Sequence, residues 1–337
     1  MSAQIKTLLF IIIFILLNIE SYSQDKNFNF YKHAIKKETI KLDNRIIIGF
    51  VSTLDINEKG DLLITDRITN KVFLFSKKGN LIRELSPDSC TPGFHWRPFD
   101  AKFDKQGNIL VLNSAPWGYR FNKNGKCVGG MDITFLGAPH ISFLNDGSLV
   151  GYYNMEDGNY LKLMDNLGKE KKRFGKFPDE FKRIIYRIEG GGLVTDDNDN
   201  IYQINVVSPE IFKYDKNGNF IKSFSKYPSY FNGFEKDFYS TNPTENIKEM
   251  LKMKDKTLTS SLFLIKSNLL LLQFDAGKFY GLQICDTEGN YLNREEIILD
   301  KPVINAKFSK IYFVNQPEPN KNGDLPNPEI EVYELKK

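Results

Sequence analysis

The sequence predicts an all-β fold in which six four-stranded antiparallel sheets form a closed ring. Three observations support this prediction: one hairpin recurs along the chain, its turns share one chemistry, and its strands are apolar on both faces. The hairpin reads "FDKQGNILVLN" at residues 103–113, and similar segments occupy residues 55–66, 143–154 and 194–205. Repeats of this kind bury their cores against one another, so the number of copies decides the architecture.

Aligning the chain on its turns gives six units. Each opens with a first hairpin, at residues 54–66, 101–113, 141–154, 192–205, 262–275 and 305–315. Five units continue with a second hairpin, whose turn glycines are Gly79, Gly125, Gly168, Gly218 and Gly289, spaced by 46, 43, 50 and 71 residues. Asp or Asn followed by Gly supplies the positive φ that a tight hairpin needs. Periods in the forties with four strands per unit are typical of a propeller.

The strands differ in polarity according to their order in the unit. The second strand, for example "NILVLN", is apolar on both faces and must be covered on both sides. The fourth strand, for example "NLIREL", carries charges, as an outer edge should. Because such blades bury one another, closing the array removes its exposed ends, and six units make a six-bladed β-propeller.

Ring closure is predicted from the two ends of the chain. The last unit ends at Lys337 one strand short. Near the N-terminus, "KETIKLD" at residues 37–43 alternates polar side chains with apolar Ile40 and Leu42, the pattern of a half-buried strand. We expect this segment to be the fourth strand of the last blade and to close the ring.

The repeated pattern also indicates a family. Three features recur over roughly residues 35–335: an Asp before a Gly-Asn-Ile turn, a strand that ends in Asp or Asn, and a second strand that leads to a Gly. This pattern resembles the NHL-repeat and TolB-like six-bladed propellers of exported bacterial proteins. The resemblance implies a fold and leaves the function open, because such folds host unrelated activities.

The N-terminus has the layout of a secretory signal peptide. Lys6 precedes the apolar run at residues 8–17, and small residues follow it. We therefore expect a signal peptide at 1–23, an arm at 24–34, and one propeller at 35–337 with an insertion at 225–260. An uncleaved N-terminal anchor is the alternative. The mature chain is expected to be periplasmic, cell-surface or secreted, with no membrane span.

Charge and cysteine content limit the functional classes. The formal net charge is +4 with no basic stripe, so nucleic acid is not an expected partner. The odd number of cysteines allows at most one intramolecular bridge among Cys90, Cys127 and Cys285. Cys127 and Cys285 lie in strand-like segments, where we expect buried free thiols. We expect a monomer.

Long, varied loops gather on the face that carries the connections between the second and third strands and between blades. Loops on a rigid scaffold usually carry function, and aromatic platforms with a few polar groups suit sugars or peptides. We therefore predict a binding protein that recognises a glycan, peptide or protein partner on this loop-rich face. The candidate ligand-binding residues are His95, Trp96, Arg97, Trp117, His140, Tyr153 and Asn205.

Two other interpretations remain open at this stage. In the alternative function, a metal-dependent hydrolase or lyase would use His95 and His140 at the channel mouth, as the resemblance to propeller lyases and lactonases implies. No cofactor or metal is assigned. The Asp or Asn that ends each second strand could also line a ligand site, although such residues commonly cap turns; they are Asp66, Asn113, Asn154, Asn205, Asp275 and Asn315.

Two local motifs receive structural interpretations. The segment "TDDNDN" at residues 195–200 lacks the Gly and Glu of a calcium loop, so we expect a hairpin turn there. In the insertion, Asn242 precedes a Pro and apolar residues at helical spacing, which predicts a short helix over the ring.

Overall fold

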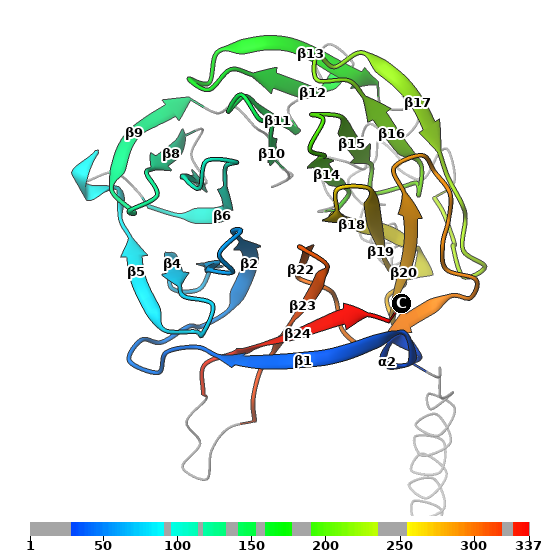
Figure 1. Ribbon diagram of the computed structural model, residues 1–337, viewed down its shortest axis with the longest axis horizontal. Helices are drawn as coiled ribbons and strands as arrows, with labels where there is room; N and C mark the ends of the chain where they lie inside the picture. Colours follow the sequence, from blue (N-terminus) through cyan, green and yellow to red (C-terminus); the bar gives the residue numbers. More distant parts are fainter. Residues whose placement is uncertain are drawn as a thin grey trace, which may run out of the picture.

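The computed structural model describes residues 28–90, 96–113, 117–132, 141–152, 159–176, 190–234, 255–318 and 326–336. Within these ranges the chain forms six four-stranded sheets around a common centre (Figure 1). Every pairing between neighbouring strands whose register is defined is antiparallel. The six-bladed β-propeller predicted from the sequence is therefore confirmed.

The first three blades follow the chain in order. Blade 1 contains β2 (Val51–Ile56), β3 (Leu62–Asp66), β4 (Lys71–Phe75) and β5 (Leu81–Leu85). Blade 2 contains β6 (Pro98–Phe103), β7 (Ile109–Asn113), β8 (Trp117–Phe121) and β9 (Cys127–Asp132). Blade 3 contains β10 (Ile141–Phe143), β11 (Leu149–Tyr152), β12 (Asn159–Met164) and β13 (Glu170–Lys176). The 3₁₀ helix η1 (Pro87–Ser89) follows blade 1.

The other three blades complete the ring. Blade 4 contains β14 (Gly192–Thr195), β15 (Ile201–Ile204), β16 (Ile211–Tyr214) and β17 (Phe220–Phe224). Blade 5 contains β18 (Leu258–Lys266), β19 (Leu269–Asp275), β20 (Tyr280–Asp286) and β21 (Ile297–Leu299). Blade 6 contains β22 (Asn305–Lys307), β23 (Lys310–Asn315), β24 (Glu329–Leu335) and β1 (Ala34–Lys41), which the short helix α2 (Phe30–His33) precedes. The first strand of each blade lies nearest the centre (Figure 1).

The N-terminal strand closes the ring as predicted. β1 pairs antiparallel with β24, from Ala34 opposite Leu335 to Lys41 opposite Glu329. Just before it, the ring of Phe30 is fully buried, with its centroid 5.2 Å from that of Phe313 and 5.6 Å from that of Tyr333. The end of the chain and its N-terminal part are thus joined by backbone pairing and by aromatic packing.

Among the described residues the core forms six clusters, each shared by two neighbouring blades. Leu63 of blade 1 packs with Phe103 and Val111 of blade 2, and corresponding clusters join the blades around the ring. The cluster between blades 6 and 1 includes Ile40 and Leu54. Because both faces of each described blade meet a neighbour, the double-sided apolar strands have the burial that their sequences require.

Hairpin turns follow the predicted chemistry. The segment at 195–200 is a turn in which the Asp196 carboxylate accepts hydrogen bonds from the N–H groups of Asn198 and Asn200, both at 2.9 Å. Gly79 has φ of 83°, and a Cβ there would lie 2.0 Å from the carbonyl oxygen of Lys41 in β1. Glycine at this turn therefore permits both the tight reversal and the close approach of the closing strand.

The segment after β17 is anchored in the core between blades 4 and 5. Tyr230 and Phe231 pack against Phe274, with ring centroids 6.1 and 6.2 Å away. The helix predicted after Asn242 lies outside the described residues, as do residues 1–27 with the predicted signal peptide. Within the described ranges, no helix is long and apolar enough to cross a bilayer.

Candidate functional site

A cavity of about 930 Å³ occupies the centre of the ring, and we call it the central cavity. Its lining comes from the first strand of all six blades and from the turns that follow those strands, such as Asn57–Asp61 and Asp104–Gly107. The cavity thus reaches the face that carries the turns of the first hairpins. Its volume lies in the range of typical small-molecule sites, which is roughly 300–1,000 Å³.

One wall of the central cavity is charged. Asp55 of β2 is 4% exposed, and its carboxylate accepts a hydrogen bond from the N–H of Phe103 at 2.8 Å. Its other oxygen accepts a hydrogen bond from the ammonium of Lys307 in β22 at 3.2 Å. Both oxygens of Asp55 therefore have partners within the protein.

Asp100 and Lys102 of β6 complete the charged wall. Burial raises the pKa of Asp100 to about 6, against the opposing effects of Lys102 and the Thr53 hydroxyl. Burial disfavours the charge on Lys102, but Asp100 and then Asp55 outweigh it and raise the pKa of its ammonium. Lys102 consequently stays protonated inside the ring, beside a carboxylate that titrates near neutral pH.

The facing wall is mostly apolar. Ile141 of β10, Val194 of β14, and Phe263 and Leu264 of β18 contribute to its lining. The last three are partly exposed and also pack against the neighbouring cores, Val194 and Leu264 between blades 4 and 5 and Phe263 between blades 5 and 6. The hydroxyls of Ser142 and Thr195 lie 3.0 Å apart on the same side. This arrangement can hold a molecule that is apolar on one side and polar or charged on the other. Among the described residues, no three His, Cys, Asp or Glu side chains gather as metal ligands would.

The sequence predicted a different set of site residues. Of the seven candidates, His95, His140 and Tyr153 lie outside the described residues, and for Trp117 only the backbone in β8 is described. The metal-dependent alternative rests on His95 and His140, so it stays a prediction. Of the three candidates whose side chains are described, Trp96, Arg97 and Asn205, none lines the central cavity.

The other three candidates are Trp96, which packs in the core, Arg97, which is exposed, and Asn205, which caps a turn. The ring of Trp96 packs into the core between blades 1 and 2, with its centroid 5.6 Å from that of Tyr119. Arg97 is exposed, and its backbone N–H donates to the side-chain oxygen of Asn113. Asn205 is 4% exposed and accepts a hydrogen bond from the N–H of Val207 at 3.2 Å.

The residues that end the second strands cap turns. Besides Asn113 and Asn205, the carboxylate of Asp66 accepts hydrogen bonds from the N–H groups of Gly49, Phe50, Ile68 and Thr69, at 2.6 to 3.2 Å. Asp275 accepts one from Gly277 at 2.8 Å, and Asn154 lies outside the described residues. For Asp66, Asn205 and Asp275 the turn-capping interpretation is confirmed, whereas Asn113 holds the N–H of Arg97, 16 positions earlier in the chain.

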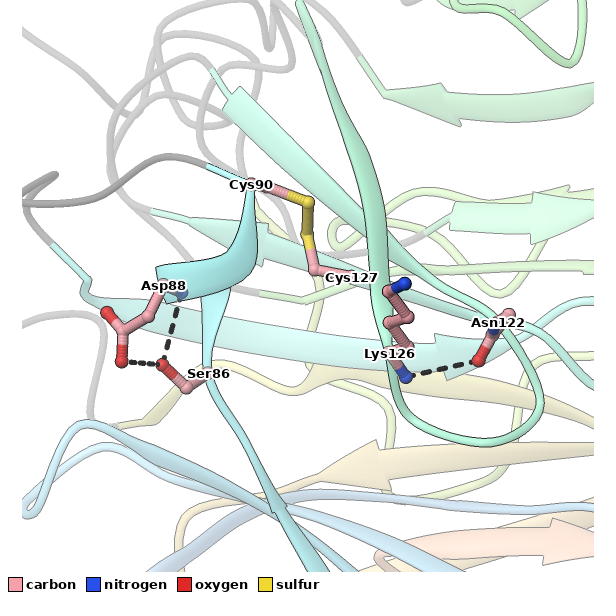
Figure 2. The surroundings of a disulfide bond; sticks show 6 residues. All are labelled: Ser86, Asp88, Cys90, Asn122, Lys126 and Cys127. Carbon is pink, nitrogen blue, oxygen red and sulfur yellow. Dashed lines mark hydrogen bonds between the residues drawn. A yellow bond between two sulfur atoms is a disulfide. The ribbon is translucent and has the colours of Figure 1, made fainter.

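One cysteine prediction is wrong. Cys127, expected as a free thiol, forms a disulfide with Cys90, with Cα atoms 5.8 Å apart; Figure 2 shows the bridge between the end of η1 and the start of β9. The strand pattern around Cys127 indicated burial, which is correct at 5% exposed, but it carried no information on the loop that brings Cys90 to it. Cys285 is free and buried, as predicted.

Comparisons with solved structures agree with the fold. A member of the DUF4221 family from Bacteroides vulgatus aligns with a TM-score of 0.65 at 11% identity, over 90% of this chain and 98% of its own. A candidate exported protein from Bacteroides fragilis gives 0.67 at 12% identity, over 91% and 96%. Virginiamycin B lyase from Staphylococcus aureus gives 0.47 at 15%, over 84% and 80%, which is too distant to carry an argument about activity.

No protein-family model matches the chain, and no curated protein matches its sequence. At 11 and 12% identity, the two similar structures show the fold alone. The case for a function therefore rests on the central cavity and its lining.

Proposed function

We propose that this chain is an exported propeller of the NHL-repeat or TolB-like kind that acts as a monomer and binds a small ligand in its central cavity. The observation that carries this proposal is a cavity of about 930 Å³ whose charged wall, with Asp100 and Lys102, faces an apolar wall. Sites for small molecules usually combine apolar lining with a few positioned polar groups. Binding without catalysis is the simpler use of these groups.

Three observations support export. The first residues have a signal-peptide pattern. The disulfide between Cys90 and Cys127 suits an oxidising compartment. The similar Bacteroides fragilis structure is of a candidate exported protein.

A thermal-unfolding screen tests ligand binding. Free amino acids, short peptides, sugars and organic acids are added to the wild-type chain, to Val194→Trp, which fills the central cavity, and to Ile221→Trp on the outer strand β17, which is the matched control. A ligand at a hundred times its Kd stabilises the folded state by about 2.7 kcal/mol. We expect such ligands to stabilise the wild type and Ile221→Trp and to have no effect on Val194→Trp.

Two results would contradict the proposal. In one, no compound raises the unfolding temperature of the wild type. In the other, compounds stabilise Val194→Trp as much as Ile221→Trp, which would move binding away from the central cavity.

We also propose the loop-rich face as a contact surface for a glycan, peptide or protein partner. Ile47, Phe50 and Ile68 are 80%, 57% and 68% exposed, and they lie in neighbouring loops before β2 and after β3. Exposed apolar groups that cluster in this way mark interaction sites. Peptide and glycan arrays should lose signal with Ile68→Ser and keep it with Leu167→Ser, which removes a residue 79% exposed in the turn between β12 and β13. Equal signal from both variants would refute this surface.

A further inference from the structure

We propose that the central cavity selects a small zwitterion with an apolar body, such as a free amino acid with an apolar side chain. This inference rests on the proposed binding function and names the ligand class. Its carboxylate would bind the ammonium of Lys102, its ammonium would bind the carboxylate of Asp100, and its body would lie against the apolar wall.

The ammonium of Lys102 has hydrogen-bond donors that no described residue uses. Lys102 lines the cavity, and its ammonium makes no hydrogen bond and no ion pair within 4 Å to any described residue. The influence of Asp100 and Asp55 on it acts at longer range. An ammonium has three N–H donors, and inside a protein such donors are normally satisfied. Lys102 therefore offers them to a ligand.

Asp100 places a carboxylate next to Lys102. It lies two residues before Lys102 on the same strand, and both side chains line the cavity. Two residues along a strand separate the Cα atoms by roughly 6.6 Å. Asp100 is 1% exposed; its carboxylate accepts a hydrogen bond from the N–H of Ala101 at 2.8 Å and lies beside the Thr53 hydroxyl. A carboxylate has about four acceptor positions, so further acceptor capacity remains. An anion and a cation thus stand side by side with the separation that a zwitterionic head group spans.

The neighbouring charged pair does not compete for this ligand. Asp55 uses one oxygen for Lys307 and the other for the N–H of Phe103. A ligand would have to break these bonds before it could bind there. Asp100 and Lys102 are therefore the pair that can accept a ligand at the least cost in lost contacts.

Charge balance separates a zwitterion from singly charged ligands. The described residues of the cavity lining include six carboxylates and six lysines, so their charges balance and leave no net charge to offset an anion or a cation. Burying an uncompensated charge is costly, whereas a zwitterion adds none and meets one charge of each sign. The apolar wall, with Val194, Phe263 and Leu264, then suits an uncharged hydrocarbon body.

Calorimetric titration with three matched compounds tests the inference. L-Phenylalanine is the zwitterion, N-acetyl-L-phenylalanine is the anion, and L-phenylalaninamide is the cation. At pH 7.0, which keeps the amino group of the amide largely protonated, we expect the zwitterion to bind at least about tenfold more tightly than either analogue, because each analogue loses one charge-assisted hydrogen-bonding group. Equal or tighter binding of either analogue would overturn the inference and leave binding in the cavity standing.

Two variants assign the charges. Lys102→Met should weaken L-phenylalanine at least about tenfold and change the cationic amide far less, whereas Asp100→Asn should weaken L-phenylalanine at least about tenfold and change the N-acetyl compound far less. Lys216→Met, in an exposed turn of blade 4, is the control and should bind as the wild type does. Circular dichroism verifies that each variant is folded.

The remaining outcomes are also decisive. Zwitterion binding that survives both Lys102→Met and Asp100→Asn would contradict the assignment. Failure of all three compounds, while another class in the screen binds the cavity, would overturn the zwitterion inference alone. Failure of every compound in the screen would overturn the proposed function with it.

Discussion

Replacing Phe30 by alanine should loosen the closure of the ring. The Phe30 side chain is fully buried against Phe313 and Tyr333, so its removal leaves a cavity where the N-terminal segment packs on blade 6. Truncating a buried Phe costs about 3–5 kcal/mol. At the entropy typical of globular proteins, unfolding of the roughly 250 described residues contributes about 0.5 kcal/mol per kelvin, so the unfolding temperature should fall by about 6–10 °C.

The matched control is Phe28→Ala, two residues earlier, where the side chain is 44% exposed. We expect it to change the unfolding temperature by less than about 2 °C, since partly exposed positions have little packing to lose. Differential scanning calorimetry measures both variants, and limited proteolysis reports release of the N-terminal segment. If Phe30→Ala unfolds at the temperature of Phe28→Ala, closure by residues 30–41 does not stabilise the ring.

Three further predictions concern buried polar groups. Asp66→Ala should lower the free energy of unfolding in urea by at least about 2 kcal/mol, because four backbone N–H groups lose their acceptor, and a loss under 0.5 kcal/mol would contradict the capping role. The pKa of Asp100 is raised to about 6, so the stability that this group contributes is full below about pH 4 and is lost as the pH rises through 6. Asp100→Asn should therefore gain stability relative to the wild type between pH 4 and 7.5, by up to about 3 kcal/mol in urea titrations. A stability difference that does not change with pH would refute this prediction. Burial raises the pKa of the Cys285 thiol to about 12, so a thiol reagent should label it only after denaturation, and rapid labelling of the native chain would show that the site opens.

The fold followed from the sequence because its signals are local and repeated. Hairpin turns and strand polarity are set by neighbouring residues. Because the unit occurs six times, the common pattern is visible even though single copies deviate from it. Even the long-range pairing of β1 with β24 was predictable, since residues 37–43 showed a strand pattern and the last unit lacked one strand.

The disulfide was not predictable in the same way. The pattern around Cys127 indicated a buried strand, and this part was correct. Its partner Cys90 follows η1, whose position depends on how the chain leaves blade 1. No residue pattern reports that path, so the pairing emerged only in three dimensions.

The central cavity was missed although its signal was present. The first strand of blade 2 reads "PFDAKF", with Asp100 and Lys102 at alternate positions of a strand that lies innermost in the ring. Of the residues predicted from the sequence, Trp96 packs in the core and Asn205 caps a turn. Charged residues at alternate positions of an innermost strand point into the channel, and this rule would have identified the wall.

The pairing of β1 with β24 also constrains how the protein reaches its folded state. Lys36 and Glu331, which meet across this pair at 2.7 Å, are 295 positions apart in the chain. A ribosome or an export channel delivers β1 before, and β24 after, the strands of the first five blades. Blade 6 therefore stays incomplete while the rest of the polypeptide emerges, and its edges need protection from association with other chains during that interval.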